Sequence, residues 1–323
     1  MDIEADTKLG RDGVPSPSAA TVGGGTPTLP ECRVFATTSI GRRVFLGGIV
    51  AAVAATAGGS QPVQQGKPAL RIAHVGDPQF GFITGRPSMK HRAKERFEEN
   101  YRDDLARLER ALARVNELKP DLLVFGGDMT QRPGDIEKEW PALLKRVQVP
   151  FVVTPGNHDM GNRLTRENLE RFRKVFGRDY GALDVKGWRV VAGNSQYWHK
   201  TEAKDEQAKY EAWVKAELEE AKSRNGRVIL ATHIPPFAFA SDEKNSYDNY
   251  PLAGRAARLE AYAASGARFF LTAHLHRLSV RGYKDVTMLG VEAVCANFDA
   301  RPPGFRLLEV NDDFSYSWNF IAV

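Results

Sequence analysis

Cysteine is scarce in this chain of 323 residues, which contains Cys32 and Cys295 and no others. Two cysteines cannot build the disulfide framework of a small secreted scaffold, and their separation does not match a thiolate zinc site. Glycine and proline, with 29 and 18 residues, stay at ordinary levels, which excludes a collagen-like or fully disordered chain. With 42% hydrophobic residues, the length allows one large or two medium globular domains.

A strong excess of one charge is also missing, because 45 basic residues face 40 acidic ones and leave a net charge of +5. Basic and acidic residues alternate along expected helices, for example at positions 94–96 and 107–110. Such mixing is typical of solvated helix faces rather than of a nucleic-acid groove. No nucleic-acid partner is therefore predicted, although the small positive balance favours anionic substrates by steering.

The N-terminal region lacks a hydrophobic run long enough to span a bilayer. Its apolar stretch at 44–57 is shorter than the roughly 20 residues that a span needs. Arg42 and Arg43 precede Phe45 and Leu46, and this order resembles a twin-arginine export signal. We therefore expect a disordered leader and signal at 1–57, with cleavage after the small residues at 55–57.

This signal predicts the twin-arginine export machinery as a partner and an exported protein, periplasmic or extracellular. No stable transmembrane helix is expected after cleavage. Two alternatives stay open: the arginine pair is a chance feature of a tail, or the signal remains uncleaved and anchors the protein in the membrane.

Beyond a short linker at 58–69, a single domain without internal repeats is expected over 70–323. Short apolar runs predict strands at 70–75, 122–125, 151–154, 189–192, 228–232 and 268–272, with more strand from 286 onward. Apolar residues at helical spacing predict helices at 90–118, 165–176 and 203–224. This alternation predicts an α/β fold with substantial parallel pairing.

The expected strands end in residues that can bind a metal or move a proton. These candidates are Asp77, Gln79, Asp128, Asn157, His158, His233, His274 and His276. Because ligands of α/β folds bind beyond the carboxyl ends of the strands, we expect them at one rim. Each has an ordinary explanation when taken singly, such as a turn, a cap or a core histidine. Five strand ends together favour a site, whereas His91 and His199 are interpreted as ordinary histidines.

The mixture of carboxylate, amide and imidazole donors indicates divalent-metal chemistry on a phosphate ester. Two ions roughly 3.5–4 Å apart can neutralise phosphoryl oxygens and hold a bridging hydroxide as nucleophile. Imidazole with carboxylate suits two ions of Mn, Fe or Zn, and the choice among them stays open. Asp128, preceded by two glycines, is the natural bridging ligand. His158 is expected over the substrate, with Asp159 orienting its ring.

Five sequence blocks resemble the calcineurin-like metallophosphoesterases in composition and order. They are Gly76-Asp77-x-Gln79, Gly127-Asp128, Gly156-Asn157-His158-Asp159, His233 and Ala273-His274-x-His276, and the likeness runs from Arg71 to Phe298. The Asp77-Pro78-Gln79 block is similar to a branch that contains a eukaryotic serine/threonine phosphatase.

This resemblance implies a two-sheet β-sandwich flanked by helices, with a dinuclear metal centre at one edge. It implies a first metal held by Asp77, Gln79, Asp128 and His276. It implies a second metal held by Asp128, Asn157, His233 and His274. His158 would bind the phosphoryl oxygens or protonate the leaving group.

Two residues depart from the family pattern. Gln79 stands where most of the superfamily has histidine, and its neutral amide is a weaker ligand that could also act through water. Ala273 replaces the usual glycine, and its methyl group restricts the backbone if a positive φ is needed there.

These observations predict a metal-dependent phosphoesterase that favours phosphomonoesters. The alternatives are a phosphodiesterase acting on nucleotides or lipid head groups, and a catalytically weak metal- or phosphate-binding module. Arg86, Arg132 and Arg163 follow the ligand loops and are candidates to bind substrate phosphate, with ordinary surface arginines as the equal alternative. The segment 237–251 is expected to be a loop near His233 that shapes specificity or is an ordinary surface excursion. Cys295 is expected to pack in the core.

Overall fold

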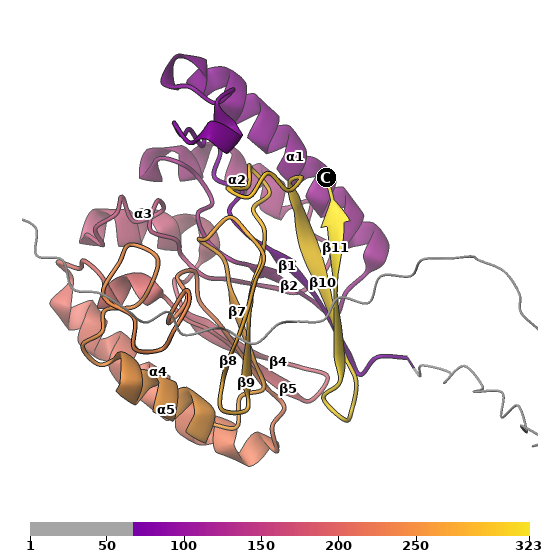
Figure 1. The fold of residues 1–323 in the computed structure, drawn as a ribbon, viewed down its shortest axis with the longest axis vertical. Coiled ribbons are helices and arrows are strands. Elements are labelled where there is room, and N and C mark those ends of the chain that lie inside the picture. The colour runs from indigo at the N-terminus through magenta and orange to yellow at the C-terminus, as the bar shows by residue number, and fades with distance from the viewer. Residues whose placement is uncertain (1–66) are drawn as a thin grey trace, which may run out of the picture. The chain divides into compact units, whose positions relative to one another are not determined.

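The computed structural model describes residues 67–323, so the predicted leader and signal at 1–57 and most of the predicted linker at 58–69 lie outside the described residues. Two mixed β-sheets form the centre of the described part, with helices on both outer faces (Figure 1). The strand orders are β11-β10-β1-β2-β3 and β4-β5-β6-β7-β9-β8. The predicted α/β fold with two sheets and flanking helices is thereby confirmed.

The first sheet contains the parallel strands β1 (Leu70–Val75), β2 (Leu122–Phe125) and β3 (Phe151–Val153). At its other edge, β10 (Gly304–Val310) pairs antiparallel with β1, and β11 (Tyr316–Ala322) pairs antiparallel with β10. The carboxyl ends of β1, β2 and β3 therefore lie at the same edge of this sheet.

The second sheet has four parallel strands, β5 (Trp188–Ala192), β6 (Val228–Ala231), β7 (Phe269–Thr272) and β9 (Val286–Gly290). Antiparallel strands border it, β4 (Gly181–Val185) on one side and β8 (Ser279–Tyr283) on the other. This arrangement brings the carboxyl ends of β6 and β7 next to each other.

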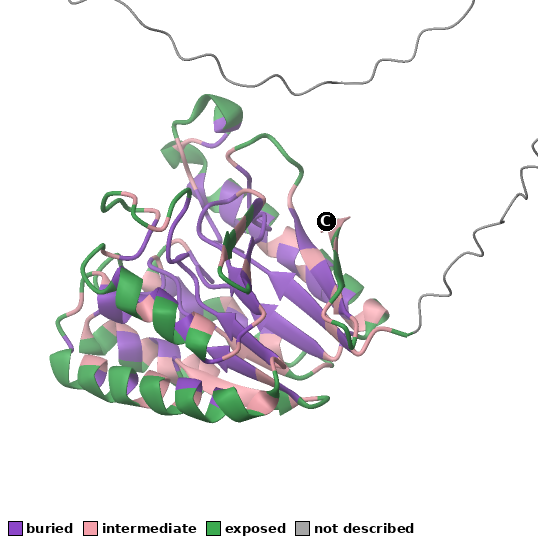
Figure 2. Cartoon of the chain, turned by 60° about the horizontal axis from the view of Figure 1, so that its bottom comes forward, coloured by how far each residue is buried: buried purple, intermediate pink, exposed green. Residues whose placement is uncertain are grey.

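Alternating side chains explain the layered packing. Leu122 and Val124 belong to the apolar cluster between the sheets, whereas Leu123 and Phe125 pack with the outer helices. Figure 2 shows the central strands as buried and the helices as buried on one side only. The central strands β2, β6 and β7 read as continuous apolar runs because both of their faces are covered.

The helices cover the two outer faces (Figure 1). They are α1 (Phe97–Leu118), α2 (Ile136–Leu144), α3 (Arg166–Phe176), α4 (Lys204–Ala221) and α5 (Arg255–Ala264). Against the first sheet, the Phe125 ring lies 5.4 Å from that of Trp140 in α2. On the other side, Tyr262 of α5 packs 5.1 Å from Phe270 of β7.

The predicted helix ends agree with local chemistry. Thr165 caps α3 by accepting a hydrogen bond from the backbone N–H of Asn168, and Gly177 follows the last helical residue with a φ of 79°. The helix expected at 90–118 begins later, at Phe97, after a short 3-10 turn. The strands β4 and β8 and the helices α2 and α5 were not predicted.

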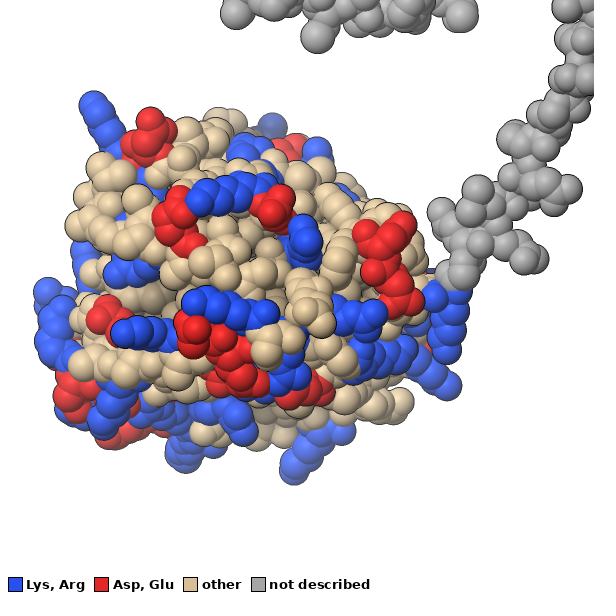
Figure 3. Space-filling model, turned by 90° about the horizontal axis from the view of Figure 1, so that it is seen from below, with Lys and Arg blue, Asp and Glu red and all other residues tan. Residues whose placement is uncertain are grey.

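The described surface mixes charges of both signs. Figure 3 shows one face on which basic and acidic side chains are interleaved rather than gathered by sign. Arg189, for example, contacts Glu217 at 2.7 Å and Asp184 at 2.9 Å. Separately, none of the helices within residues 67–323 is both long and apolar enough to cross a membrane.

Candidate metal centre

The predicted ligands follow the carboxyl ends of parallel strands in both sheets. From the first sheet, β1 leads to Asp77 and Gln79, β2 to Asp128, and β3 to Asn157. From the second sheet, β6 leads to His233, and β7 leads to His274 and His276. All seven are buried, so the chain places ionisable and polar groups where unpaired charge is costly.

One group of ligand atoms surrounds His233. Its Nε2 lies 3.3 Å from Asp128 Oδ2, 3.2 Å from His274 Nδ1 and 3.1 Å from Asn157 Oδ1. The candidate donor atoms of Asp128, His233 and His274 all lie within 4.8 Å of one another. These four residues are the set that the family resemblance implied for the second metal.

A second group lies beside the first. Asp77 Oδ1 is 3.4 Å from His276 Nε2 and 4.0 Å from His233 Nδ1. Gln79 Oε1 is buried without a hydrogen-bond partner among the described residues, and Gln79 lines the same cavity as Asp128 and His276. A buried carbonyl oxygen without a donor is costly unless something else binds it, and a cation meets that need.

Each of the three histidines turns one ring nitrogen to a main-chain carbonyl. His233 Nδ1 is 2.7 Å from the oxygen of Gly126, His274 Nε2 is 3.0 Å from that of Tyr247, and His276 Nδ1 is 2.8 Å from that of Ala296. A carbonyl accepts only from an N–H, so these contacts fix the tautomers and leave the opposite nitrogens as lone-pair donors. This pattern is typical of metal-binding histidine, and the donor set fits two divalent ions.

The ligand backbone is unusual. Five of the seven predicted ligands have positive φ angles within the described part: Asp77 (46°), Gln79 (35°), Asp128 (51°), His274 (69°) and His276 (46°). Non-glycine residues rarely adopt this conformation, and such residues cluster at active sites and ligand clamps. The fold therefore holds these side chains in place at a cost in local free energy.

Two glycines allow the ligands to approach one another. A Cβ at Gly156 would lie 1.9 Å from Asp128 Oδ1, and one at Gly127, where φ is 98°, would lie 2.6 Å from His233 Nδ1. At Ala273 the predicted difficulty does not arise, because this residue is not among those with positive φ. Its methyl group is fully buried and faces Gly76 and Gly126, whose missing side chains leave room for it.

In the group around His233, the pKa values of Asp128 and His233 depend on each other. Burial would lower the pKa of His233, but the carboxylate of Asp128 outweighs it and raises the pKa to about 9. Burial works against ionised Asp128, yet His233 and His158 hold its pKa well below the usual range. Without a cation, a proton on His233 balances the negative charge of the buried Asp128 carboxylate. A metal ion and this proton therefore compete for the Nε2 atom of His233.

His158 faces the cavity, and its neighbours correct one expectation. Asp159 was predicted to orient the His158 ring, but its carboxylate accepts the backbone N–H groups of Met129 and Gly156, both at 2.8 Å. The ring is instead contacted by Gln131, whose side-chain Nε2 lies 3.2 Å and whose main-chain oxygen lies 3.3 Å from His158 Nδ1. Asp159 therefore connects the loop after β2 with the loop after β3, because its buried carboxylate accepts backbone N–H groups from both. Burial and the nearby Asp128 raise the pKa of Asp159 to about 8.

One of the three predicted arginines lies at the site. Arg86 lines the cavity that contains His158, with its guanidinium 3.9 Å from the centroid of the Phe298 ring. Arg132 instead stacks 3.6 Å over Phe97, and Arg163 pairs with Glu202 at 2.9 Å, so neither is placed on the substrate side. Sequence proximity to a ligand loop did not determine where these long side chains point.

Tyr247 is a site residue that the sequence did not single out. It lies in the segment 237–251, which was expected to be a loop near His233, and it lines the cavity. Its hydroxyl accepts a hydrogen bond of 2.5 Å from Asn157 Nδ2 and lies 3.5 Å from His158 Nε2. The abundance of polar and aromatic residues in this segment was the available signal, but it did not identify the residue.

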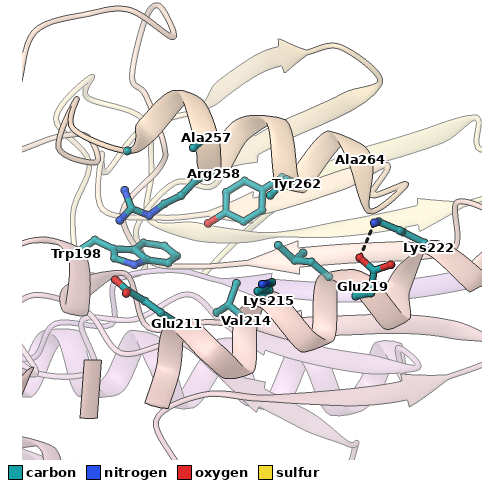
Figure 4. A pocket seen from close by; sticks show the side chains of 13 residues that line it. Trp198, Glu211, Val214, Lys215, Glu219, Lys222, Ala257, Arg258, Tyr262 and Ala264 are labelled. Atoms are coloured by element: carbon teal, nitrogen blue, oxygen red, sulfur yellow. Dashed lines mark hydrogen bonds and ion pairs between the residues drawn. The ribbon is translucent and has the colours of Figure 1, made fainter. Parts of the chain in front are cut away.

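A separate groove of about 400 Å³ lies between α4 and α5 (Figure 4). Val214, Leu218 and Tyr262 line it, Trp198 closes one end under Arg258 at 4.5 Å, and Glu219 pairs with Lys222 at the other. None of the predicted metal ligands lines this groove. The candidate reaction site is therefore the smaller cavity of about 90 Å³ at the strand ends.

Comparisons with known proteins agree with this geometry. Residues 70–278 match the family model described as calcineurin-like phosphoesterase. The serine/threonine-protein phosphatase CPPED1 of Homo sapiens is 27% identical over 250 residues, which cover 72% of this chain and 78% of that protein. The Probable glycerophosphodiester phosphodiesterase GpdQ of Arcobacter nitrofigilis is 30% identical over 127 residues, 38% of this chain and 45% of that protein.

One solved structure shows the same fold. A dimetal phosphatase from Danio rerio aligns with a TM-score of 0.50 and 12% identity, over 79% of this chain and 96% of that one. At this identity the likeness concerns the arrangement of sheets and helices. The predicted family resemblance and the predicted fold are both confirmed.

Proposed function

Because the chain belongs to the calcineurin-like phosphoesterase family, whose members are hydrolases of phosphate esters, we propose that it hydrolyses phosphomonoesters at a dinuclear metal centre. Asp77, Gln79, Asp128 and His276 would hold one ion. Asp128, Asn157, His233 and His274 would hold the other. Manganese, iron and zinc are the candidates because imidazole and carboxylate donors suit them.

The observation that carries this proposal is the shared orientation of His233, His274 and His276, each of which has one ring nitrogen on a main-chain carbonyl and the other free to bind a metal. Three separate carbonyls, those of Gly126, Tyr247 and Ala296, each contact one ring nitrogen. The opposite nitrogens of His233 and His276 face carboxylates, and that of His274 faces His233 Nε2. Histidines that only pack in a protein core do not need one ring nitrogen on a carbonyl and the other left free. Together with the unpartnered oxygen of Gln79, this shared orientation favours an enzyme over a weak binding module.

Two bound ions would supply positive charge to the phosphoryl oxygens and lower the pKa of the attacking water. The chain itself contributes His158, which lies at the same cavity as Asp128 but is not part of either ligand group. The side-chain amide of Gln131 lies 3.2 Å from Nδ1 of His158, and its donation to Nδ1 places the ring N–H at Nε2, on the substrate side. From there it can donate a proton to the leaving-group oxygen.

The preference for monoesters is supported by the small cavity of about 90 Å³, which suits one phosphoryl group better than a group substituted on two sides. Arg86 at its rim can pair with the doubly charged phosphate of a monoester. CPPED1, a phosphatase by name, covers far more of the chain than GpdQ does. The phosphodiesterase named among the relatives makes diester hydrolysis the alternative to test.

Metal analysis and a paired substrate assay test the proposal. The purified protein should contain about two metal ions per chain, and with Mn it should hydrolyse p-nitrophenyl phosphate faster than bis-p-nitrophenyl phosphate. The Asp128→Asn variant should lose both metal and turnover, whereas Asp103→Asn, an exposed position on α1, should retain them. A strong diester preference would reverse the substrate choice, and a protein that takes up no metal would support the binding module.

We also propose that the protein is exported by the twin-arginine route and acts outside the cytoplasm. Arg42 and Arg43 support this from the sequence, and both lie outside the described residues. In a bacterial host, a double Arg→Lys change at these positions should retain the protein in the cytoplasm, while the unchanged chain is fractionated with the exported or membrane material. Equal distribution of the two forms would contradict export by this route.

A further inference from the structure

We propose that the hydroxyl of Tyr247 is a substrate-positioning group of this metal centre, an inference that rests on the proposed function. Tyr247 lies between β6 and α5 and lines the cavity together with Asp128, His158 and His276. Its side chain is 58% exposed, so it forms part of the mouth rather than of the core.

Tyr247 contacts His274 and Asn157, two of the residues proposed to hold the second metal ion. Its main-chain oxygen lies 3.0 Å from His274 Nε2, and its ring centroid lies 4.9 Å from that of His274. Its hydroxyl accepts a hydrogen bond from Asn157 Nδ2, which leaves Asn157 Oδ1 facing His233. The position of the hydroxyl is therefore tied to the geometry of the ligands.

The hydroxyl proton can be redirected to a substrate. Tyr247 now donates it to Asn162 Oδ1 at 3.2 Å, but that oxygen already accepts a shorter bond of 2.8 Å from Asn157 Nδ2. Turning the O–H toward the cavity leaves no buried acceptor without a donor. The hydroxyl lies 3.5 Å from His158 Nε2, so a phosphoryl oxygen beside that nitrogen is within its reach.

The loop that carries Tyr247 is held in place by the half-buried Glu243 and the buried Asn249 and Arg255. Glu243 accepts hydrogen bonds from the backbone amides of Ala238, Phe239 and Ala240 and from the side chain of Asn249. Arg255, which is fully buried, donates to the main-chain oxygens of Tyr250 and Glu243. A hydroxyl supported in this way is pre-organised, so it can position substrate without a closing movement.

The test is Tyr247→Phe in the full metal-loaded chain, because this change removes the hydroxyl and keeps the ring and the carbonyl that contacts His274. We expect kcat/KM for p-nitrophenyl phosphate to fall about 10- to 100-fold, the effect of losing one hydrogen bond to a charged group. The Kd for inorganic phosphate, measured by calorimetry, should rise, while metal content stays at the wild-type level. Tyr316→Phe, an exposed tyrosine on β11, is the matched control and should change none of these.

The outcomes separate this inference from the proposed function. Wild-type values of kcat/KM and phosphate Kd in Tyr247→Phe would overturn the inference. Loss of activity in proportion to loss of metal would also overturn it, because the hydroxyl would then act only by holding Asn157. A wild-type protein that binds phosphate and metal but turns over no ester would refute the proposed function, and the phosphate Kd of the variant would still decide the role of Tyr247.

Discussion

At the scale of single residues, the metal ligands differ from ordinary turn residues in their backbone conformation. Asp77, Gln79, Asp128, His274 and His276 all have positive φ. Each residue in such a conformation costs of order 1–3 kcal/mol unless its surroundings determine it. Hydrogen bonds such as those from the His274 N–H to Asp77 and from the Gln79 N–H to the Asp128 oxygen offset this cost. The sequence showed which residues lie at strand ends but not that they are strained.

Gly156 is required because it lies against Asp128. In Gly156→Ala, the new methyl group would overlap Asp128 Oδ1 and push the carboxylate out of the ligand group. We expect metal content and turnover to fall together, and the free energy of unfolding to drop by about 1–3 kcal/mol, as in overpacked sites. Metal analysis and urea unfolding measure both effects.

Gly282→Ala is the control for this change, because a Cβ there meets no heavy atom within 4 Å. It should bind metal like the wild-type protein. Full metal content in Gly156→Ala would mean that Asp128 does not need its observed position.

His158 is expected to act on the substrate without holding metal. Removing its ring in His158→Ala should lower turnover by about 10²–10⁴-fold, the scale of general acid–base catalysis, and leave metal content unchanged. His91→Ala, an exposed histidine, should behave like the wild-type protein in both measurements. Unchanged turnover of p-nitrophenyl phosphate in His158→Ala would remove this residue from the mechanism.

At the scale of elements, a clear apolar pattern made a segment predictable, whatever its length. The helix α1 shows its period over 22 residues, and the strands β1, β2 and β6 are continuous apolar runs although β2 and β6 have four residues each. In contrast, α2 contains Pro141 and begins after a 3-10 turn, so propensity argued against it. The edge strands β4 and β8 are mostly half-buried or exposed, and packing against a neighbouring strand supplies what their sequences lack.

Glu292 links elements of the two sheets. It follows β9, is 1% exposed, and accepts hydrogen bonds from Arg306 of β10 at 2.7 and 2.6 Å. Burial alone would raise the pKa of Glu292, but the arginine contacts lower it below its usual range. A carboxyl group with a lowered pKa in the folded state stabilises the protein above the unfolded pKa, about 4.3, and loses this contribution as the pH falls further.

Glu292→Gln should therefore lower the free energy of unfolding by about 1.5–3 kcal/mol at pH 7, because Arg306 loses its charged partner. The difference from the wild-type protein should shrink in acid, since the wild-type carboxyl is then protonated as well. Urea unfolding at pH 7 and at an acidic pH measures this difference. Glu309→Gln removes the more exposed pair with Arg71 and should cost about 0–1 kcal/mol at pH 7. A difference that stays constant over the pH range would contradict the role of the carboxylate charge.

At the scale of the whole molecule, the site exists only because two sheets present their strand ends to each other. The order of motif blocks was enough to predict which residues meet, and the seven expected ligands do lie together. Side chains whose direction depends on tertiary packing were not predictable, as Arg132 on Phe97 and Asp159 on backbone amides show. Tyr247 was missed for the same reason, because only the buried anchors of its loop bring it over the cavity.

This joint construction predicts that metal stabilises the entire fold. Ions held by residues of both sheets bind only the folded chain, and occupancy at 100 times Kd adds about 2.7 kcal/mol for each independent site. Loss of both ions should therefore lower the Tm of the metal-loaded protein by about 10–20 °C, given the size of the domain. Scanning calorimetry with and without a chelator measures this shift, which should be absent in Asp128→Asn and retained in Asp103→Asn. Equal Tm values for loaded and chelated wild-type protein would mean that the ligands of the two sheets do not share a metal centre.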